Sequence, residues 1–208
     1  MRDRTARNAS SMKSRSDVLL VAAAGATALG WGLTSRQLKR EQTDDLTGLP
    51  TRRRFMTIVK RHLRWCRGDL LFVLIDIDRF KLVNDDFGHD VGNLVLWHAA
   101  QRLTGALPTL RAATRLGGDE FGALITQPTR DDVDILMRAL SAPVKLSREV
   151  AIPTSASVGG VVISPRSGAT ASSALRAADE QMYLSKRLHR GEPGMPTPTQ
   201  VPATSAPR

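Results

Sequence analysis

The sequence predicts an α+β domain: a central mixed or antiparallel sheet surrounded by helices and preceded by one hydrophobic helix near the N-terminus. Segments with helical and strand-like hydrophobic patterns alternate along the chain. Two short strands are joined by a glycine-rich hairpin, which pairs neighbouring strands antiparallel. The chain has 208 residues, of which 41% are hydrophobic, and this suffices for one domain with a buried core.

The segment before this domain divides into three parts. Residues 1–17 form a basic tail, residues 18–35 carry no charge, and residues 36–43 form a linker. A helix over 18–35 would reach about 27 Å, slightly less than the hydrocarbon thickness of a bilayer. We therefore expect a membrane-anchoring helix. A signal peptide cleaved near residues 26–28 and an apolar helix buried against a partner are the alternatives.

The predicted domain spans residues 44–190. Gly48 and Pro50 mark a turn, after which Thr51 can cap the first helix. The apolar residues on one side of this helix are Phe55, Ile58, Val59 and Leu63. Further helices are expected at 88–107, 131–142 and 171–190, and strands at 69–78, 113–116, 121–126 and 153–164. Residues 191–208 contain five prolines and no apolar periodicity, so we expect a disordered tail.

Charge and composition limit the functional classes. The chain carries 30 Lys and Arg against 20 Asp and Glu, a net charge of +10. Aromatic residues make up only 4%, so a stacking surface for nucleic acid is not supported and no nucleic-acid partner is expected. The single cysteine, Cys66, fits a reducing compartment. The four histidines, at positions 62, 89, 98 and 189, lack the spacing of zinc ligands.

Two acidic groups predict a metal site. Asp76 and Asp78 end an apolar strand and share one of its faces, and Asp119 and Glu120 lie in the hairpin of ATRLGGDEFGAL, residues 113–124. If the hairpin lies beside the strand, three or four carboxylates converge and repel one another by several kcal/mol unless a divalent cation lies among them. Hard oxygen ligands favour magnesium or manganese, and magnesium usually completes its shell with substrate phosphates.

Glycines and cations near these acids favour a phosphorylated substrate. Gly117 and Gly118 permit positive φ and let a nucleotide approach the backbone. Lys81 follows the aspartates closely, and Lys186 and Arg190 are four apart on the last helix, so both point one way. A solvated basic face is the alternative for that pair. No G-x-x-x-x-G-K-[ST] loop occurs, so metal and side chains must bind the phosphates.

Six blocks of sequence resemble a known family. In chain order they are DDLTGLPTRRRF, DIDRFKLVND, FGHDVGN, RLGGDEF, SASVGG and AADEQMYLSK, between Asp44 and Arg190. Their order and spacing are similar to those of the GGDEF-domain family, the diguanylate cyclases. The resemblance implies a sheet ringed by helices, related to the polymerase palm and the class III nucleotide cyclases. It also implies an enzyme that joins two GTP molecules into the bacterial second messenger cyclic di-GMP.

The resemblance implies a role for each matching residue. Metal ions would be held by Asp76, the carbonyl of Ile77, Asp119 and Glu120. Glu120 would assist at the metal or in activating the 3′-hydroxyl, so Asp119 and Glu120 are the expected catalytic residues. Phosphates would be bound by Phe80, Lys81, Lys186 and Arg190, and the base by Asn84 and Asn93. The expected mechanism is two-metal phosphoryl transfer. One domain holds one nucleotide, so a homodimer is expected.

The sequence departs from the family pattern at several positions. Asn93 replaces a usual Asp and offers one acceptor and one donor where Asp offers two acceptors. Guanine selectivity is therefore either relaxed or maintained by Asn84 alone. The inhibitory product site R-x-x-D reads PTLR at 108–111, so no feedback inhibition through it is expected. His189 and Gly191 replace Gly and Asn in the K-x-x-G-R-N pattern, which leaves both cations in place.

Two other functions stay open at this point. The first is a non-catalytic GGDEF domain that binds nucleotide or a protein and acts as a regulator, and Asn93 is the main argument for it. The second is a nucleic-acid binder, which only the charge supports. Because GTP is intracellular, the enzyme is expected at the bacterial inner membrane with its domain facing the cytoplasm. If 18–35 is not inserted, it is cytoplasmic, and a helix lying flat on the inner surface would also fit.

Overall fold

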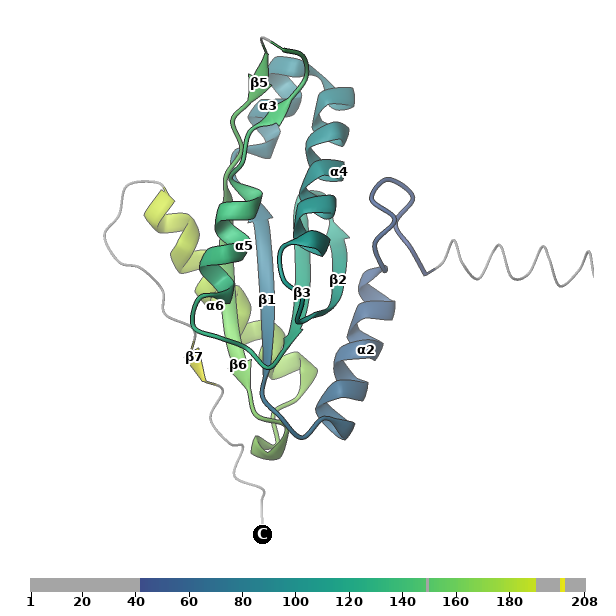
Figure 1. Ribbon diagram of the computed structural model, residues 1–208, viewed down its shortest axis with the longest axis vertical. Coiled ribbons are helices and arrows are strands. Elements are labelled where there is room, and N and C mark those ends of the chain that lie inside the picture. Colours follow the sequence, from purple (N-terminus) through teal and green to yellow (C-terminus); the bar gives the residue numbers. More distant parts are fainter. Residues whose placement is uncertain (1–41, 149, 190–198, 201–208) are drawn as a thin grey trace, which may run out of the picture. The chain divides into compact units, whose positions relative to one another are not determined.

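The computed structural model describes residues 42–148, 150–189 and 199–200, which form an α+β fold with helices on both faces of a sheet (Figure 1). The helices are α2 (Arg52–Trp65), α3 (Phe80–Phe87), α4 (His89–Gly105), α5 (Asp132–Leu140) and α6 (Ala171–His189), with a short 3-10 helix at Pro165–Ser167. The strands are β1 (Leu70–Ile77), β2 (Leu110–Gly117), β3 (Glu120–Thr126), β4 (Val144–Lys145), β5 (Ala151–Ile152), β6 (Ala156–Ile163) and β7 (Thr199–Gln200). The predicted α+β fold, with a central sheet surrounded by helices, is confirmed, whereas the hydrophobic helix expected before it lies outside the described residues.

The strand β1 lies at the centre of the sheet, whose order is β2-β3-β1-β6-β7. It pairs antiparallel with both β3 and β6, while β7 pairs parallel with β6. All eight residues of β1 are buried, as expected of an apolar run covered on both faces. The hairpin β2–β3 therefore lies directly beside the strand that ends in Asp76, which is the condition that the predicted carboxylate cluster requires.

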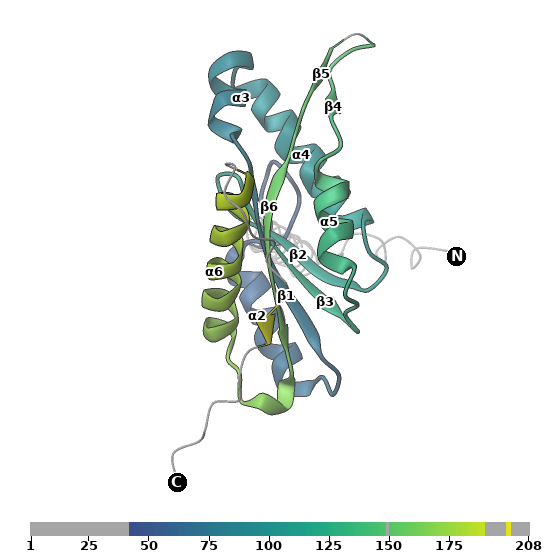
Figure 2. The ribbon, with the colours of Figure 1, turned by 90° about the vertical axis from the view of Figure 1, so that its left-hand side faces the viewer.

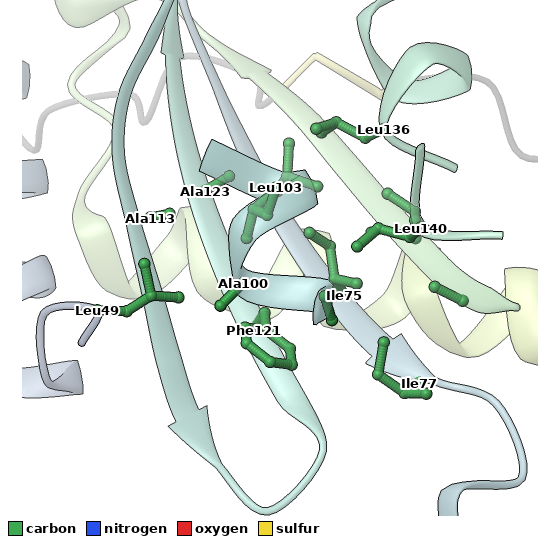
Figure 3. Close-up of a cluster of buried hydrophobic side chains, with 14 of the residues drawn as sticks. Leu49, Ile75, Ile77, Ala100, Leu103, Ala113, Phe121, Ala123, Leu136 and Leu140 are labelled. Atoms are coloured by element: carbon green, nitrogen blue, oxygen red, sulfur yellow. The ribbon is translucent and has the colours of Figure 1, made fainter. Parts of the chain in front are cut away.

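The sheet separates two hydrophobic cores, one on each of its faces. On one face, Ile75 and Phe121 of the sheet pack with Ala100 and Leu103 of α4 (Figure 3). On the other face, alternate residues of the same strands, such as Phe72 and Leu74, pack against α2 and α6. Figure 2 shows α6 on one side of the sheet and α4 and α5 on the other. We call the side covered by α2 and α6 the α2/α6 face.

Several elements differ from the sequence prediction. The helix α3 was not predicted, and β4 and β5, which pair antiparallel in a small second sheet, were missed as well. The strand β2 begins at Leu110 rather than at residue 113. Thr199 and Gln200 form β7 within the segment that was expected to be disordered. The rest of 191–208 lies outside the described residues.

The predicted hydrophobic helix at 18–35, the basic tail at 1–17 and most of the linker at 36–43 also lie outside the described residues. In the part of the chain that the structure does describe, none of the helices combines the length and the apolar character needed to span a bilayer.

Candidate active site

The site is built around Asp76, at the end of β1. In the sheet register, Asp76 lies opposite Glu120 of β3 on one side and Ser157 of β6 on the other. Residues opposite each other in an antiparallel pair direct their side chains to the same face, so Asp76 and Glu120 share the α2/α6 face. The backbone N–H of Ile77 donates to the Asp119 carbonyl at 3.2 Å, which places the hairpin acids next to the end of β1.

Asp76 forms an ion pair with Lys186 of α6. The ammonium nitrogen lies 2.8 Å from Oδ2 of Asp76, and the side chains are 12% exposed for Asp76 and 30% exposed for Lys186. Burial raises the pKa of the Asp76 carboxyl, and the charges of Asp119 and Glu120 raise it further. The hydrogen bond and charge of Lys186 lower this pKa but do not cancel the burial. A cation close to Asp76, such as the Lys186 ammonium, therefore stabilises its charged form.

A close approach of α6 to β6 positions Lys186. A Cβ atom at Gly159 would overlap the Ala178 carbonyl oxygen and the Met182 backbone, so a glycine is needed for this packing. One residue before Lys186, the hydroxyl of Ser185 accepts a hydrogen bond from the backbone N–H of Val158 at 3.2 Å. These contacts fix α6 against β6 at the level of Asp76.

Arg115 holds the glycine turn. Its Nε donates to the Gly118 carbonyl at 2.8 Å, and its Nη1 lies 3.2 Å from Oδ2 of Asp44. Gly118 has a φ of 53°, which a residue with a side chain rarely adopts. Burial would raise the pKa of Asp44, but hydrogen bonds from Thr47 and the charge of Arg115 outweigh it and lower this pKa. Arg115 therefore ties the turn to the segment that begins at Asp44.

Asp78, the fourth acid of the predicted cluster, has other partners. Its carboxylate accepts hydrogen bonds from the hydroxyls of Ser155 at 2.7 Å and Ser157 at 2.6 Å. Across residues 42–148 and 150–189, no group of three or more His, Cys, Asp or Glu side chains is close enough to hold a metal ion. The cation found beside Asp76 is the ammonium of Lys186.

Two of the residues expected to bind the base and phosphates, Phe80 and Asn84, lie where α3 meets α4. Arg79 has a φ of 56°, and this left-handed residue turns the chain from β1 into α3, which begins at Phe80. A Cβ at Gly92 of α4 would overlap Oδ1 of Asn84 and lie 3.3 Å from the ring of Phe80. Asn84 and Phe80 thus meet α4 one residue before Asn93, which is exposed.

Two further residues, Lys81 and Arg190, were also expected to bind phosphates. Lys81, the second residue of α3, is exposed. Arg190 lies outside the described residues, so its predicted role as a phosphate ligand stays a prediction. In the segment 108–111, which lacks the R-x-x-D pattern of the inhibitory site, Nε of Arg111 donates a hydrogen bond to Nε2 of His62 at 3.0 Å.

The partners of Asp76 and Asp78 were not predicted from the sequence. The signal for Lys186 was present, because Ala178 and Met182 are buried against the sheet and Lys186 continues the same four-residue spacing. A pocket of about 360 Å³ next to Glu120 on the α2/α6 face was not predicted either. Its lining residues are Arg52, Leu74, Ile75, Leu116, Glu120, Phe121, Ser172, Leu175, Arg176, Asp179 and Met182.

Comparison with known proteins identifies the family. The model of the family described as "Diguanylate cyclase, GGDEF domain" matches residues 41–192. The chain is 37% identical over 157 residues to diguanylate cyclase TpbB of Pseudomonas aeruginosa, covering 71% of this chain and 36% of TpbB. It is 29% identical over 154 residues to cyclic di-GMP phosphodiesterase PdeR of Escherichia coli, covering 72% of this chain and 23% of PdeR.

A solved structure agrees with this assignment. The GGDEF domain of TpbB from Pseudomonas aeruginosa superposes with a TM-score of 0.64 at 32% identity, covering 78% of this chain and 94% of that domain. The chain spans about a third of the length of TpbB, so the likeness concerns the domain and not the whole relative. The family match, the fold and the glycine turn together show that the chain belongs to the GGDEF-domain family of diguanylate cyclases.

Proposed function

We propose that this chain is a diguanylate cyclase that joins two GTP molecules into cyclic di-GMP, with one nucleotide held by each domain of a homodimer. The observation that carries the proposal is the pairing of the nearly buried Asp76 with Glu120 across β1 and β3. An ammonium group 2.8 Å from Asp76 supports a cation site at this position. A buried acid and an exposed one on the same face, beside a glycine turn, are suited to phosphoryl transfer.

Magnesium or manganese is the cofactor that the chemistry of these donors favours, although among the described residues no three ligating side chains lie close enough to hold an ion. Asp76, Asp119 and Glu120 offer carboxylates and Ile77 offers a carbonyl, and hard cations prefer such oxygen ligands. The burial that raises the pKa of Asp76 makes a cation favourable there. When bound, the metal would polarise the phosphate and lower the pKa of the attacking hydroxyl.

The chain's own residues would bind and orient the substrate. Asn84 and Asn93 hold the base, and Phe80, Lys81, Lys186 and Arg190 hold the phosphates. Glu120 accepts the proton of the 3′-hydroxyl, whose oxygen forms a bond to the α-phosphorus of the second GTP while pyrophosphate leaves. A second, identical step closes the ring. Because each domain supplies one set of these residues, the second nucleotide has to come from a partner domain.

Product formation by the full chain tests this proposal. Incubation with Mg²⁺ and GTP is expected to give cyclic di-GMP and pyrophosphate, identified by mass spectrometry. Asp119→Ala and Glu120→Ala are expected to lose product, whereas Asp134→Ala, which removes an exposed acid from α5, keeps it. No cyclic dinucleotide from a folded, GTP-binding wild-type chain would contradict the proposal.

A second candidate is a regulatory GGDEF domain that binds nucleotide or a protein without turning GTP over. The specific observation for it is Asn93, which replaces an acid at the expected base-binding position. A relative named as a cyclic di-GMP phosphodiesterase also contains a matching segment. Asp119→Ala separates the two candidates, because an enzyme loses its product and a regulator keeps its partner.

For its location, we propose that residues 18–35 hold the domain at the inner membrane, facing the cytoplasm where GTP is present. Flotation of the full chain with vesicles tests this placement. A chain lacking residues 1–35 should stay in the soluble fraction and keep its cyclase activity.

A further inference from the structure

We infer that Lys186 alternates between two partners, the carboxylate of Asp76 in the absence of metal and the triphosphate of the substrate in its presence. It thereby makes metal binding and nucleotide binding cooperative. The inference deepens the proposed function and rests on it. In this arrangement the side chain of Lys186 neutralises the charge of Asp76 until metal and nucleotide bind together.

The ion pair and a metal ion compete for the same group. The ammonium of Lys186 lies 2.8 Å from Oδ2 of Asp76, within the distance of a charge-assisted hydrogen bond. A metal ion coordinated by this carboxylate would come close to the ammonium, and two cations at one carboxylate repel each other. Binding of the metal at Asp76 therefore favours release of Lys186.

Of the two partners in this ion pair, the side chain of Lys186 is the one that can change its position. Asp76 is fixed, because its backbone is paired on one side with β3 and on the other with β6. The helix α6 is also fixed, by its close approach at Gly159 and by the hydrogen bond of Ser185 to Val158. Lys186 is 30% exposed and has a flexible four-carbon stem, so a rotamer change can move its charge toward solvent or a bound phosphate.

The exchange has a thermodynamic consequence. Metal alone has to displace Lys186 and leaves the ammonium without a partner, so its affinity is reduced. In the presence of a triphosphate, the displaced ammonium gains a new anionic partner. Linkage then requires that metal strengthens nucleotide binding by the same factor by which nucleotide strengthens metal binding. Substitution of Lys186 by a neutral residue should therefore change the two affinities in opposite directions.

The test measures binding by the full chain. Mn²⁺ affinity is followed by electron paramagnetic resonance without nucleotide, and the affinity for a non-reacting methylene analogue of GTP is followed by calorimetry with saturating Mn²⁺. Lys186→Gln is compared with wild type and with Lys145→Gln, which removes an exposed charge from β4. We expect Lys186→Gln to bind Mn²⁺ alone at least about fivefold more tightly and the analogue at least about fivefold more weakly.

The outcomes separate this inference from the proposed function. If Lys186→Gln weakens both affinities, or changes neither relative to Lys145→Gln, the exchange is wrong, whether or not the wild type makes cyclic di-GMP. If the two affinities change in opposite directions while the wild type makes no product, the exchange stands and the cyclase proposal falls. Far-ultraviolet circular dichroism of both variants confirms that they are folded.

Discussion

Asp76 and Glu120 lie directly opposite each other on adjacent antiparallel strands, with their side chains on the same face of the sheet. Two acids that are 44 positions apart in sequence are therefore neighbours in space. The pairing follows from the hairpin β2–β3, which returns the chain to the edge of β1.

Gly159→Ala is expected to destabilise the domain by about 1–3 kcal/mol, because the new methyl group would overlap the backbone of α6 at Ala178 and Met182. Displacement of α6 would also move Lys186 away from Asp76. Urea unfolding monitored by circular dichroism measures the free-energy change. Gly105→Ala is the matched control, because a Cβ at Gly105 meets no atom within 4 Å. Equal stabilities of the two variants would show that the close approach is not required.

Arg115→Ala is expected to lower the free energy of unfolding by about 1 kcal/mol at pH 6, because Asp44 and the Gly118 carbonyl lose a partner. Arg138→Ala, which removes an exposed arginine from α5, should have a smaller effect. The loss should depend on pH. Since the pKa of Asp44 is lowered in the fold, its stabilising contribution is present above the ordinary value of 3.8 and disappears as the pH falls through the lowered pKa.

Unfolding of wild type and Arg115→Ala at a series of pH values tests this expectation. The difference between the two should shrink as the pH falls from 6 toward 3. A difference that stays constant over this range would mean that the Asp44 carboxylate does not contribute through Arg115.

Asp76→Asn is expected to raise the stability of the protein at pH 7 while removing its activity. The pKa of Asp76 is raised by burial, so its contribution to stability is present below the ordinary pKa and is lost as the pH rises through the raised one. At pH 7 the buried charge of the carboxylate therefore lowers the free energy of unfolding, and the uncharged amide of asparagine does not. Thermal and urea unfolding at pH 7 measure the change. A less stable Asp76→Asn at this pH would indicate that the ion pair with Lys186 outweighs the burial of Asp76.

Asn93→Asp is expected to increase the preference for GTP over ATP. An aspartate can accept hydrogen bonds from both the N1–H and the exocyclic amine of guanine, whereas asparagine accepts only one. A good bidentate contact contributes about 1–3 kcal/mol of discrimination, so the preference should rise about fivefold or more. Turnover of each nucleotide by wild type and variant provides the comparison. Exclusive use of GTP by both would assign the selectivity to Asn84.

The parts of the fold that depend on local patterns could be predicted from the sequence. The apolar run of β1, the glycine turn at Gly117 and Gly118, and the spacing of α6 each indicated their element directly. The helix α3 was missed because its eight residues are few for a helical period and none of them is fully buried, although Phe80 and Val83 pack against the core. The strands β4 and β5 were missed because two residues are too few for a period to be read.

The candidate site was predicted less completely, because its pairings join distant segments. The sequence placed Asp76 and Asp78 on one strand face, but only the register with β6 reveals that Ser155 and Ser157 bind Asp78. The side chain of Lys186 was assigned to phosphates, while the structure pairs it with Asp76. That contact depends on the close packing of α6 against Gly159. The sequence alone does not reveal this packing, because it does not show that α6 crosses β6 at this residue.

The most direct test of the account is a titration of the full chain with Mn²⁺ in the presence of a non-reacting GTP analogue. The account predicts that wild type takes up Mn²⁺ together with the nucleotide, and that Asp76→Asn and Asp119→Asn lose this uptake while they remain folded. Uptake that is unchanged in both variants would contradict a metal site at the end of β1 and the hairpin, and the proposed cyclase mechanism with it.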